Sequence, residues 1–440
     1  MPHCDSNRKS DVLQTFFEDL SHDLSRATGF VQRTSKMTGE RFAETVILGW
    51  VANPDAPLND LVQRSAQLGV QISEAGLQQR INARAVAFLQ ALFAASIARF
   101  RERVRLPAHM LSQFSQINVV DSSLVRLPDE LQTAFKGFNT PGSAAAAKLQ
   151  LRFDYLTGDF NALQVQDGRE PDQNCPFPVQ YAVPQSLALF DLGYAKFDQL
   201  QTLTNRQAYF ITRLATRIVV YQHVDDDAPL DLVQFLARQG DHGEVDVSIG
   251  LKKQVRVRLI FQKLPPAVVA ERRRKVKRTA QKKQHGITAK HLALQAWNLF
   301  ITNLPIDRAS SQQVLQLYRV RWQAELLFKL WKSQAKLSQV GTYRPARVVC
   351  QLYARLLGVV LFNWLAAPLR LTAHGELSLP KAWRVFQQDA WRLLDAIADD
   401  WQAVPRLLDQ LRADFLRFGL KNLRRKSPST LQRLIQSGLA

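Results

Sequence analysis

The spacing of apolar residues changes once along this chain, near residue 115. Before that point, stripes such as Phe42, Val46 and Trp50 recur with the period of an amphipathic helix, so residues 11–104 are predicted to be helical. After it, short apolar or alternating runs are bounded by turn residues, as is typical of strands. The predicted strands are 117–120, 148–155, 160–165, 186–190 and 209–214, with a helix over 195–207. This order predicts an α/β fold with a mixed sheet flanked by helices.

Residues 215–290 interrupt that order and predict a β-rich insertion. Its strands, and the strand that returns to the sheet, are expected at 217–221, 245–249, 254–262 and 296–302. The acidic run Asp225–Asp227 is predicted to be an exposed loop and not a metal site. The dense basic run that follows is of a kind that is usually solvated or disordered until it meets an anion, and we favour phosphate contact. Its members are Arg272, Arg273, Arg274, Lys275, Lys277, Arg278, Lys282 and Lys283.

Helical periodicity returns in the last third of the chain. A helix is predicted from Ser311 to Lys332, with Ser310 or Ser311 as its cap, and helices are expected again from about residue 370. The chain ends in a second basic cluster, which comprises Lys421, Arg424, Arg425 and Lys426.

The charge of the chain narrows the choice of partner. Its formal net charge is +20 and its pI is about 10.1, which implies a polyanion: nucleic acid or an anionic membrane surface. The most apolar run, 356–369, is interrupted by Asn363 and Pro368 and is too short to span a bilayer, so we expect a buried helix. Nucleic acid is therefore the favoured partner, and no membrane association is expected.

The cysteines indicate a reducing compartment. Cys4, Cys175 and Cys350 lie far apart and form no Cys-x-x-Cys pair. The polar first ten residues contain no signal-peptide apolar core. Both observations predict a cytoplasmic protein.

One predicted helix carries an unusual row of polar groups. On a regular helix Tyr318, Arg321, Glu325, Lys329 and Lys332 fall within roughly 80° of one another. A carboxylate can hold a divalent metal ion, and cations beside it can hold the phosphates of a nucleic acid. The alternative is a solvated face with a Glu325–Lys329 ion pair. Three aromatic residues on the same helix favour a packed helix with one polar seam: Trp322, Phe328 and Trp331.

Two further carboxylates stand where apolar strands are predicted to end. Asp121 and Asp191 occupy positions at which active sites gather in open sheets, although each could instead cap the following turn. If Glu325 joins them, three carboxylates would repel one another unless divalent cations are bound. Two such ions held about 4 Å apart can activate water and stabilise the leaving oxygen in a displacement at phosphorus. Mg²⁺ suits ligands that are all oxygen.

These residues resemble a known family. Tyr318-x2-Arg321-x3-Glu325-x6-Lys332 is similar to the tyrosine-arginine-glutamate-lysine signature of bacterial DDE transposases of the insertion-sequence-four type. Asp121-Ser122-Ser123 resembles the first aspartate motif of that family. Asp191-Leu192-Gly193-Tyr194, followed by Tyr209-Phe210-Ile211-Thr212-Arg213, resembles the second. The long gap from Asp191 to Glu325 resembles the β-rich insertion of these enzymes.

The resemblance implies an RNase H-like mixed sheet with a β-rich insertion and helical regions at both ends. It implies a DNA-binding helical domain over 1–110, although a plain helical bundle remains an alternative for this region. The catalytic core would comprise 111–214 and 291–370, separated by the insertion at 215–290. The helical region 371–440 would serve dimerisation, or its apolar positions would form core.

The resemblance also implies the site residues and the reaction. Asp121, Asp191 and Glu325 would be the catalytic triad and would bind two Mg²⁺ ions, for which Mn²⁺ can substitute. The residues that would contact DNA are Tyr318, Arg321, Trp322, Lys329 and Lys332. Water would cut one strand at the element end, and the released 3′-OH would attack the opposite strand and later join target DNA. A homodimer on double-stranded DNA, associated with the nucleoid, is the expected assembly.

Two alternatives keep the function open at this point. A domesticated or inactive transposase would bind DNA without cutting it. Another RNase H-like nuclease or resolvase would cut but would not join ends.

Trp297 and Trp322 could both stack on a flipped base, and Trp297 could equally be a core residue. No Gly-x4-Gly-Lys-Ser/Thr loop is present in the sequence, so no nucleotide is expected.

Overall fold

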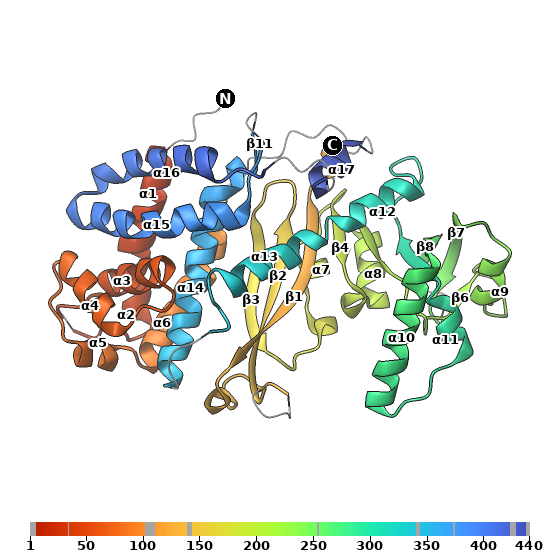
Figure 1. Ribbon diagram of the computed structural model, residues 1–440, viewed down its shortest axis with the longest axis horizontal. Helices are drawn as coiled ribbons and strands as arrows, with labels where there is room; N and C mark the ends of the chain where they lie inside the picture. The colour runs from red at the N-terminus through yellow and green to blue at the C-terminus, as the bar shows by residue number, and fades with distance from the viewer. Residues whose placement is uncertain are drawn as a thin grey trace. The chain divides into compact units, whose positions relative to one another are not determined.

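The computed structural model divides the chain into two compact units (Figure 1). It describes residues 6–33, 35–101, 111–138, 143–252, 255–339, 344–372, 375–422 and 428–436, without the side chain of Lys283. The first unit comprises Met1–Leu106, Ser122–Glu170 and Ala324–Lys426, and the second comprises Pro107–Asp121, Pro171–Gln323 and Ser427–Ala440. Cys4 and the cluster Arg424–Lys426 lie outside the described residues.

The first unit is mainly helical, as the periodicity predicted. Its helices before residue 107 are α1 (Ser6–Thr15), α2 (Ser21–Ala27), α3 (Gly39–Ala52), α4 (Leu58–Gln67), α5 (Glu74–Arg80) and α6 (Ala83–Arg99), with a π-helical turn at Phe16–Leu20 between α1 and α2. Its later helices are α14 (Pro345–Ala366), α15 (Leu379–Asp399) and α16 (Val404–Phe418). Phe42, Val46 and Trp50 of α3 are buried, so the predicted stripe is a core face.

Helix α14 forms the core of this unit and packs against α3, α6 and α15. The predicted buried helix is therefore confirmed, but its apolar stretch is longer than expected: Pro345–Leu369 is long and apolar enough to cross a membrane by length and composition. That window is completely buried by the rest of the protein. A side chain at Gly358 would meet Val51 Cγ2 at 2.1 Å, which shows how closely α14 approaches α3. Cys350 on α14 is buried and free, and burial raises its pKa to about 12.

The first unit also contains the predicted hairpin. Strands β2 (Ala145–Asp154) and β3 (Phe160–Asp167) pair antiparallel, with Leu151 opposite Leu163. The turn between them contains Gly158 at a φ of +83°, a conformation that glycine adopts without a steric penalty. A second, short antiparallel pair, β10 (Leu371–Thr372) and β11 (Gly375–Glu376), stands where helix was predicted from residue 370.

The second unit is built on a mixed sheet. Its hydrogen-bonded strand order is β1-β4-β5-β9-β8-β7-β6. The strands are β1 (Ile117–Leu127, shared with the first unit after Asp121), β4 (Leu187–Phe190), β5 (Tyr209–Arg213), β6 (Val220–Tyr221), β7 (His242–Ile249), β8 (Val255–Lys263) and β9 (Trp297–Thr302). β1, β4 and β5 are parallel, whereas β9 pairs antiparallel with both β5 and β8. The strands of the predicted insertion therefore extend the same sheet.

Helices lie between these strands along the chain or follow the last of them, as expected for an α/β fold. They are α7 (Phe177–Gln180), α8 (Phe197–Asn205), α9 (Leu232–Ala237), α10 (Pro266–Lys283), α11 (Ala289–Leu294), α12 (Ser311–Arg319) and α17 (Thr430–Gln436). Helix α8 is the predicted connection between β4 and β5. Ser310 caps α12 through a capping box with Gln313, as predicted for this serine. Asp225 and Asp227 are exposed in the loop between β6 and α9, which confirms the loop prediction.

Two local predictions were wrong. Strand β1 does not end before Asp121 but continues to Leu127, because polar residues are compatible with a strand whose exposure rises along its length. The basic run, for which no secondary structure was predicted, is helical and forms the greater part of α10. The polar row does not lie on one helix, since α12 ends at Arg319 and α13 (Trp322–Ser333) begins three residues later. Tyr318 and Glu325 therefore belong to different helices, and Arg321 lies in the turn between them.

Candidate active site

Asp121 and Asp191 are neighbours in the second unit because of the register of two parallel strands. Val119 pairs with Leu189 and Val120 pairs with Phe190, and all four apolar side chains are buried. The next residue on each strand is an aspartate, and adjacent strands lie about 4.8 Å apart. The two carboxylates thus start from neighbouring backbone positions, and both are half-buried.

Neither aspartate side chain serves as a turn cap. Asp191 occupies the N-cap position of the 3-10 turn Leu192–Tyr194, yet its side chain makes no capping hydrogen bond. It instead accepts a hydrogen bond from the Tyr318 hydroxyl at 3.4 Å. Asp121 forms an ion pair with Arg321, whose Nη1 lies 2.7 Å from Oδ2. Each aspartate is therefore paired with one residue of the motif that follows β9.

The Arg321–Asp121 ion pair is shielded from water. The two side chains are 15% and 14% exposed, so the pair is a charge-assisted hydrogen bond in a partly desolvated setting. One guanidinium thereby holds the carboxylate in place and offsets its charge. Arg321 can do so because the break between α12 and α13 places it in a turn beside Asp121 of β1.

Tyr318 is enclosed by aromatic and cationic groups. Its ring packs edge-on against Phe300 of β9, with the centroids 4.8 Å apart. The guanidinium carbons of Arg213 and Arg321 each lie 5.9 Å from the ring centroid. Burial, and then the charge of Asp191, raise the pKa of Tyr318 to about 12, although both arginines oppose this shift. The hydroxyl is consequently a protonated donor throughout the physiological range.

Arg213 ends the second aspartate motif but was not assigned a role in the predicted site. It ends β5, the parallel strand next to β4, and its guanidinium also lies 5.9 Å from the Phe300 ring. A basic residue at the carboxyl end of a strand adjacent to that of Asp191 was the sequence signal that could have identified it.

The other predicted site residues lie on α13. Its first two residues belong to the second unit, and those from Ala324 onward belong to the first. Trp322 is 55% exposed. Glu325 is half-buried in the first turn, Lys329 is exposed, and Lys332 is half-buried with its pKa lowered by burial. Phe328 and Trp331 are buried and pack edge-on at 5.2 Å, so α13 is a packed helix as predicted, although the polar row is divided between α12, the turn and α13. Trp297 is half-buried on β9 and contacts Phe261 edge-on at 6.0 Å.

The structure thus joins four predicted site residues within the second unit: Asp121, Asp191, Tyr318 and Arg321. Glu325 belongs to the first unit. Among the described residues, no group of three or more His, Cys, Asp or Glu side chains is arranged to hold a metal ion. The chemistry of the two adjacent aspartates nevertheless fits a hard cation, since carboxylate oxygens are the ligands that Mg²⁺ prefers.

Substitution of Tyr318 by Phe tests the hydroxyl without removing the ring. We expect DNA cleavage by the variant to slow by about tenfold, because one hydrogen bond to an ionised partner is lost at Asp191. Since the pKa of Tyr318 is about 12, the phenol loses its proton only above the pH range of the assay. The pH–rate profile should therefore keep its shape up to pH 10 in both proteins. A basic limb below pH 10 that is present only in the wild type would contradict the raised pKa of Tyr318.

Comparisons with known proteins identify the family to which this chain belongs. The family model described as "Transposase DDE domain" matches residues 112–361, more than half of the chain. The transposase for insertion sequence element IS231E of Bacillus thuringiensis subsp. finitimus is 27% identical over 91% of this chain and 88% of the relative. The transposase for insertion sequence element IS1151 of Clostridium perfringens is 26% identical over 93% and 92%, respectively. A cryo-EM structure of a piggyBac transposase synaptic complex with hairpin DNA covers 95% of this chain and 86% of that one, at 11% identity and a TM-score of 0.49. This chain belongs to the transposase DDE domain family, as its motifs predicted.

Proposed function

We propose that this protein is a cut-and-paste transposase that cuts double-stranded DNA at the ends of its element and joins the released 3′-OH to target DNA. The observation that carries the proposal is the pairing of the two strand aspartates with the following motif, Asp121 with Arg321 and Asp191 with Tyr318. Membership of the family supplies the reaction class. The proposed catalytic triad is Asp121, Asp191 and Glu325.

The proposed metal ligands are these same three carboxylates, with Mg²⁺ as the ion and Mn²⁺ as a substitute. When bound, two such ions would supply an activated water and stabilisation of the leaving oxygen. Arg321 orients the Asp121 carboxylate, and the Tyr318 hydroxyl orients that of Asp191. Glu325 completes the ligand set from the first turn of α13.

The DNA-binding residues are proposed to be Tyr318, Arg321, Trp322, Lys329 and Lys332. The exposed ring of Trp322 offers a stacking surface for an unpaired base, a contact worth about 1–3 kcal/mol. Lys329 is exposed and presents its charge to a phosphate. Trp297 is assigned to the core because its ring packs against Phe261.

The domain roles follow from the same proposal. Parallel β1, β4 and β5 together with the β2–β3 hairpin are consistent with an RNase H-like core, here assigned to 111–214 and 291–370. Residues 215–290 are the β-rich insertion, 1–110 the helical DNA-binding domain, and 371–440 the helical region for a homodimer. The site of action is the bacterial cytoplasm, in association with the nucleoid.

A joining assay tests this function. The purified protein is incubated with Mg²⁺, duplexes that carry the inverted repeats flanking the gene, and a supercoiled target plasmid. We expect strand nicking at the repeat and covalent insertion of the cleaved end into the plasmid. Nicking without insertion would instead indicate an RNase H-like nuclease. Binding that weakens with salt but yields neither product would indicate an inactive, DNA-binding transposase.

A further inference from the structure

Helix α10 (Pro266–Lys283) presents two very different sides. Its half-buried positions are Val269, Arg272, Val276 and Ala280, which share one face at helical spacing. The opposite face is exposed throughout and carries Arg274, Lys277, Arg278 and Gln281. A helix with this few apolar contacts is placed by its polar anchors as much as by packing.

Those anchors are two arginines that donate hydrogen bonds to neighbouring elements. Arg272 donates to Asn298 Oδ1 at 2.8 Å and to the Trp297 carbonyl at 3.4 Å, both on β9. Arg273 donates from Nε to the Leu292 carbonyl of α11 at 3.0 Å. Burial and the nearby charge of Arg213 lower the pKa of Arg272. These contacts set the rotation of α10 about its axis, so the remaining cations must point to solvent.

The charge on this helix is almost entirely of one sign. It contains eight basic residues and one acidic residue, Glu271, which pairs with Lys275 at 3.4 Å. Among the described residues, no ion pair or hydrogen bond is formed by the side chains of Arg274, Lys277 or Arg278. Arg274 and Arg278 are four residues apart, a spacing at which like charges repel and destabilise a helix. An anion on this face would relieve that repulsion.

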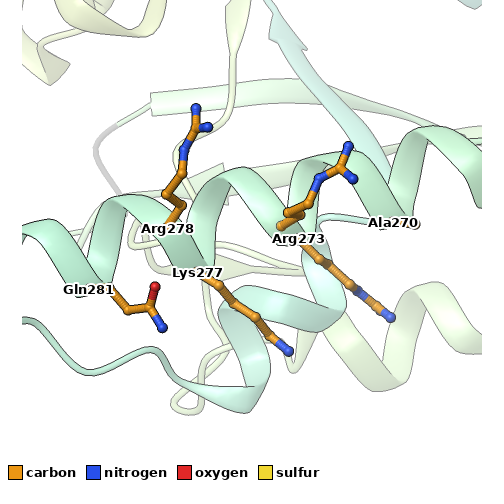
Figure 2. Close-up of a pocket in the computed structure, with 6 residues that line it drawn as sticks. Ala270, Arg273, Lys277, Arg278 and Gln281 are labelled. Atoms are coloured by element: carbon orange, nitrogen blue, oxygen red, sulfur yellow. The ribbon is translucent and has the colours of Figure 1, made fainter.

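The exposed face also has room for a ligand. A hollow of about 510 Å³ lies over the small side chain of Ala270, between the long side chains that surround it. Figure 2 shows Lys277 and Gln281 extending to one side of α10 and Arg278 to the other, so the face is broad and not a single ridge. The span from Arg274 to Arg278 is about 6 Å along the axis. Duplex DNA carries about one charge per 1.7 Å of its own axis, so several phosphates could face these cations.

We propose that the exposed face of α10 binds the phosphate backbone of double-stranded DNA without reading its sequence. The occupant is a polyanion because the residues around the hollow are cations, one amide and one alanine, with no large apolar side chain. The DNA backbone is the target because its phosphates carry the charge that these cations neutralise, and the face has no Asn and only one Gln with which to read adenine. The inference rests on the proposed function, since it assigns a second contact for the DNA on which the enzyme acts.

The test removes three charges from the full-length protein by the substitutions Arg274→Gln, Lys277→Gln and Arg278→Gln. A matched control removes three exposed charges from α15 and α16 by Arg384→Gln, Arg406→Gln and Arg417→Gln. Affinity is measured by fluorescence anisotropy without divalent metal, at several salt concentrations, on an inverted-repeat duplex and a scrambled duplex of equal length. Circular dichroism melting confirms that both variants fold.

In a plot of log affinity against log salt concentration, the slope of the α10 variant is expected to be less steep than that of the wild type by about 2.7. Each of the three lost phosphate contacts contributes about 0.9 to this difference. At 0.1 M salt its affinity should fall at least tenfold, equally on both duplexes, whereas the control should remain within about twofold of the wild type. An unchanged slope, an equal loss in the control, or a loss confined to the inverted-repeat duplex would overturn the inference. If the wild-type protein binds both duplexes but never cleaves them, the proposed catalysis is refuted. The comparison of DNA affinities still tests the role of α10 in that case.

Discussion

Glu325→Gln is expected to reduce metal-dependent cleavage of element-end DNA by at least a thousandfold. The substitution keeps the shape of the side chain but removes the charge with which it would hold a divalent ion. Metal stabilisation of a phosphoryl-transfer step is worth several kcal/mol, and each 1.36 kcal/mol corresponds to a factor of ten in rate. Affinity for the same duplex should remain within about threefold of the wild type, since no cation is lost. Single-turnover cleavage and anisotropy binding measure the two quantities separately.

The matched control for this prediction is Glu130→Gln. Glu130 is exposed in the 3-10 turn Asp129–Leu131, and its replacement changes the net charge by the same amount. It should cleave at the wild-type rate. Cleavage by Glu325→Gln at a normal rate would remove Glu325 from the proposed metal ligands. Asp121→Asn and Asp191→Asn should behave like Glu325→Gln if the three carboxylates share the ions.

Arg321→Ala is expected to slow cleavage by about a hundredfold and to lower the melting temperature. Asp121 would lose a partner at 2.7 Å in a setting where both side chains are about 15% exposed. Removal of one member of a shielded pair leaves an uncompensated charge, which costs about 1–3 kcal/mol when some solvent remains. Arg321→Lys should show an intermediate rate, because lysine keeps the charge but not the planar fork of donors.

The control is Arg319→Ala, two residues earlier at the end of α12. Arg319 is exposed, so its loss should leave both rate and melting temperature nearly unchanged. Added guanidinium is expected to restore part of the cleavage rate of Arg321→Ala, since it replaces the missing group directly, but not that of Tyr318→Phe. If Arg321→Ala merely melts earlier and cleaves normally below its melting temperature, Arg321 is structural and does not position Asp121.

Much of the fold was predictable where local signals were strong. The hairpin at Gly158, the cap at Ser310 and the strands flanking α8 followed from turn chemistry, capping chemistry and period-two alternation. The division of the polar row between two helices was not predictable in the same way. Tyr318 to Lys332 reads as continuous helix because no residue in it breaks helices, yet the chain turns at Val320 and Arg321. Buried contacts outweigh helix propensity there: Val320 is fully buried and Arg321 is bound to Asp121.

The helix formed by the basic run of α10 was not predictable from its pattern. A dense basic run is usually solvated or disordered until it meets an anion, because like charges repel and few apolar residues are available for a core. The contacts of Arg272 with β9 and of Arg273 with α11 hold the segment as a helix. Hydrogen bonds that side chains form with neighbouring elements cannot be read from periodicity.

By itself the sequence determined the class of protein, its charge and the order of most strands, because residue spacing and local turn chemistry carry that information. Only the tertiary structure shows which residue of the motif hydrogen-bonds to which aspartate. It also places the Arg213 guanidinium over the Tyr318 ring. The contacts Asp191–Tyr318 and Asp121–Arg321 join residues 127 and 200 positions apart. They depend on the parallel register of β1 with β4, which is set by burial of Val120 and Phe190 in a common core and not by either strand alone.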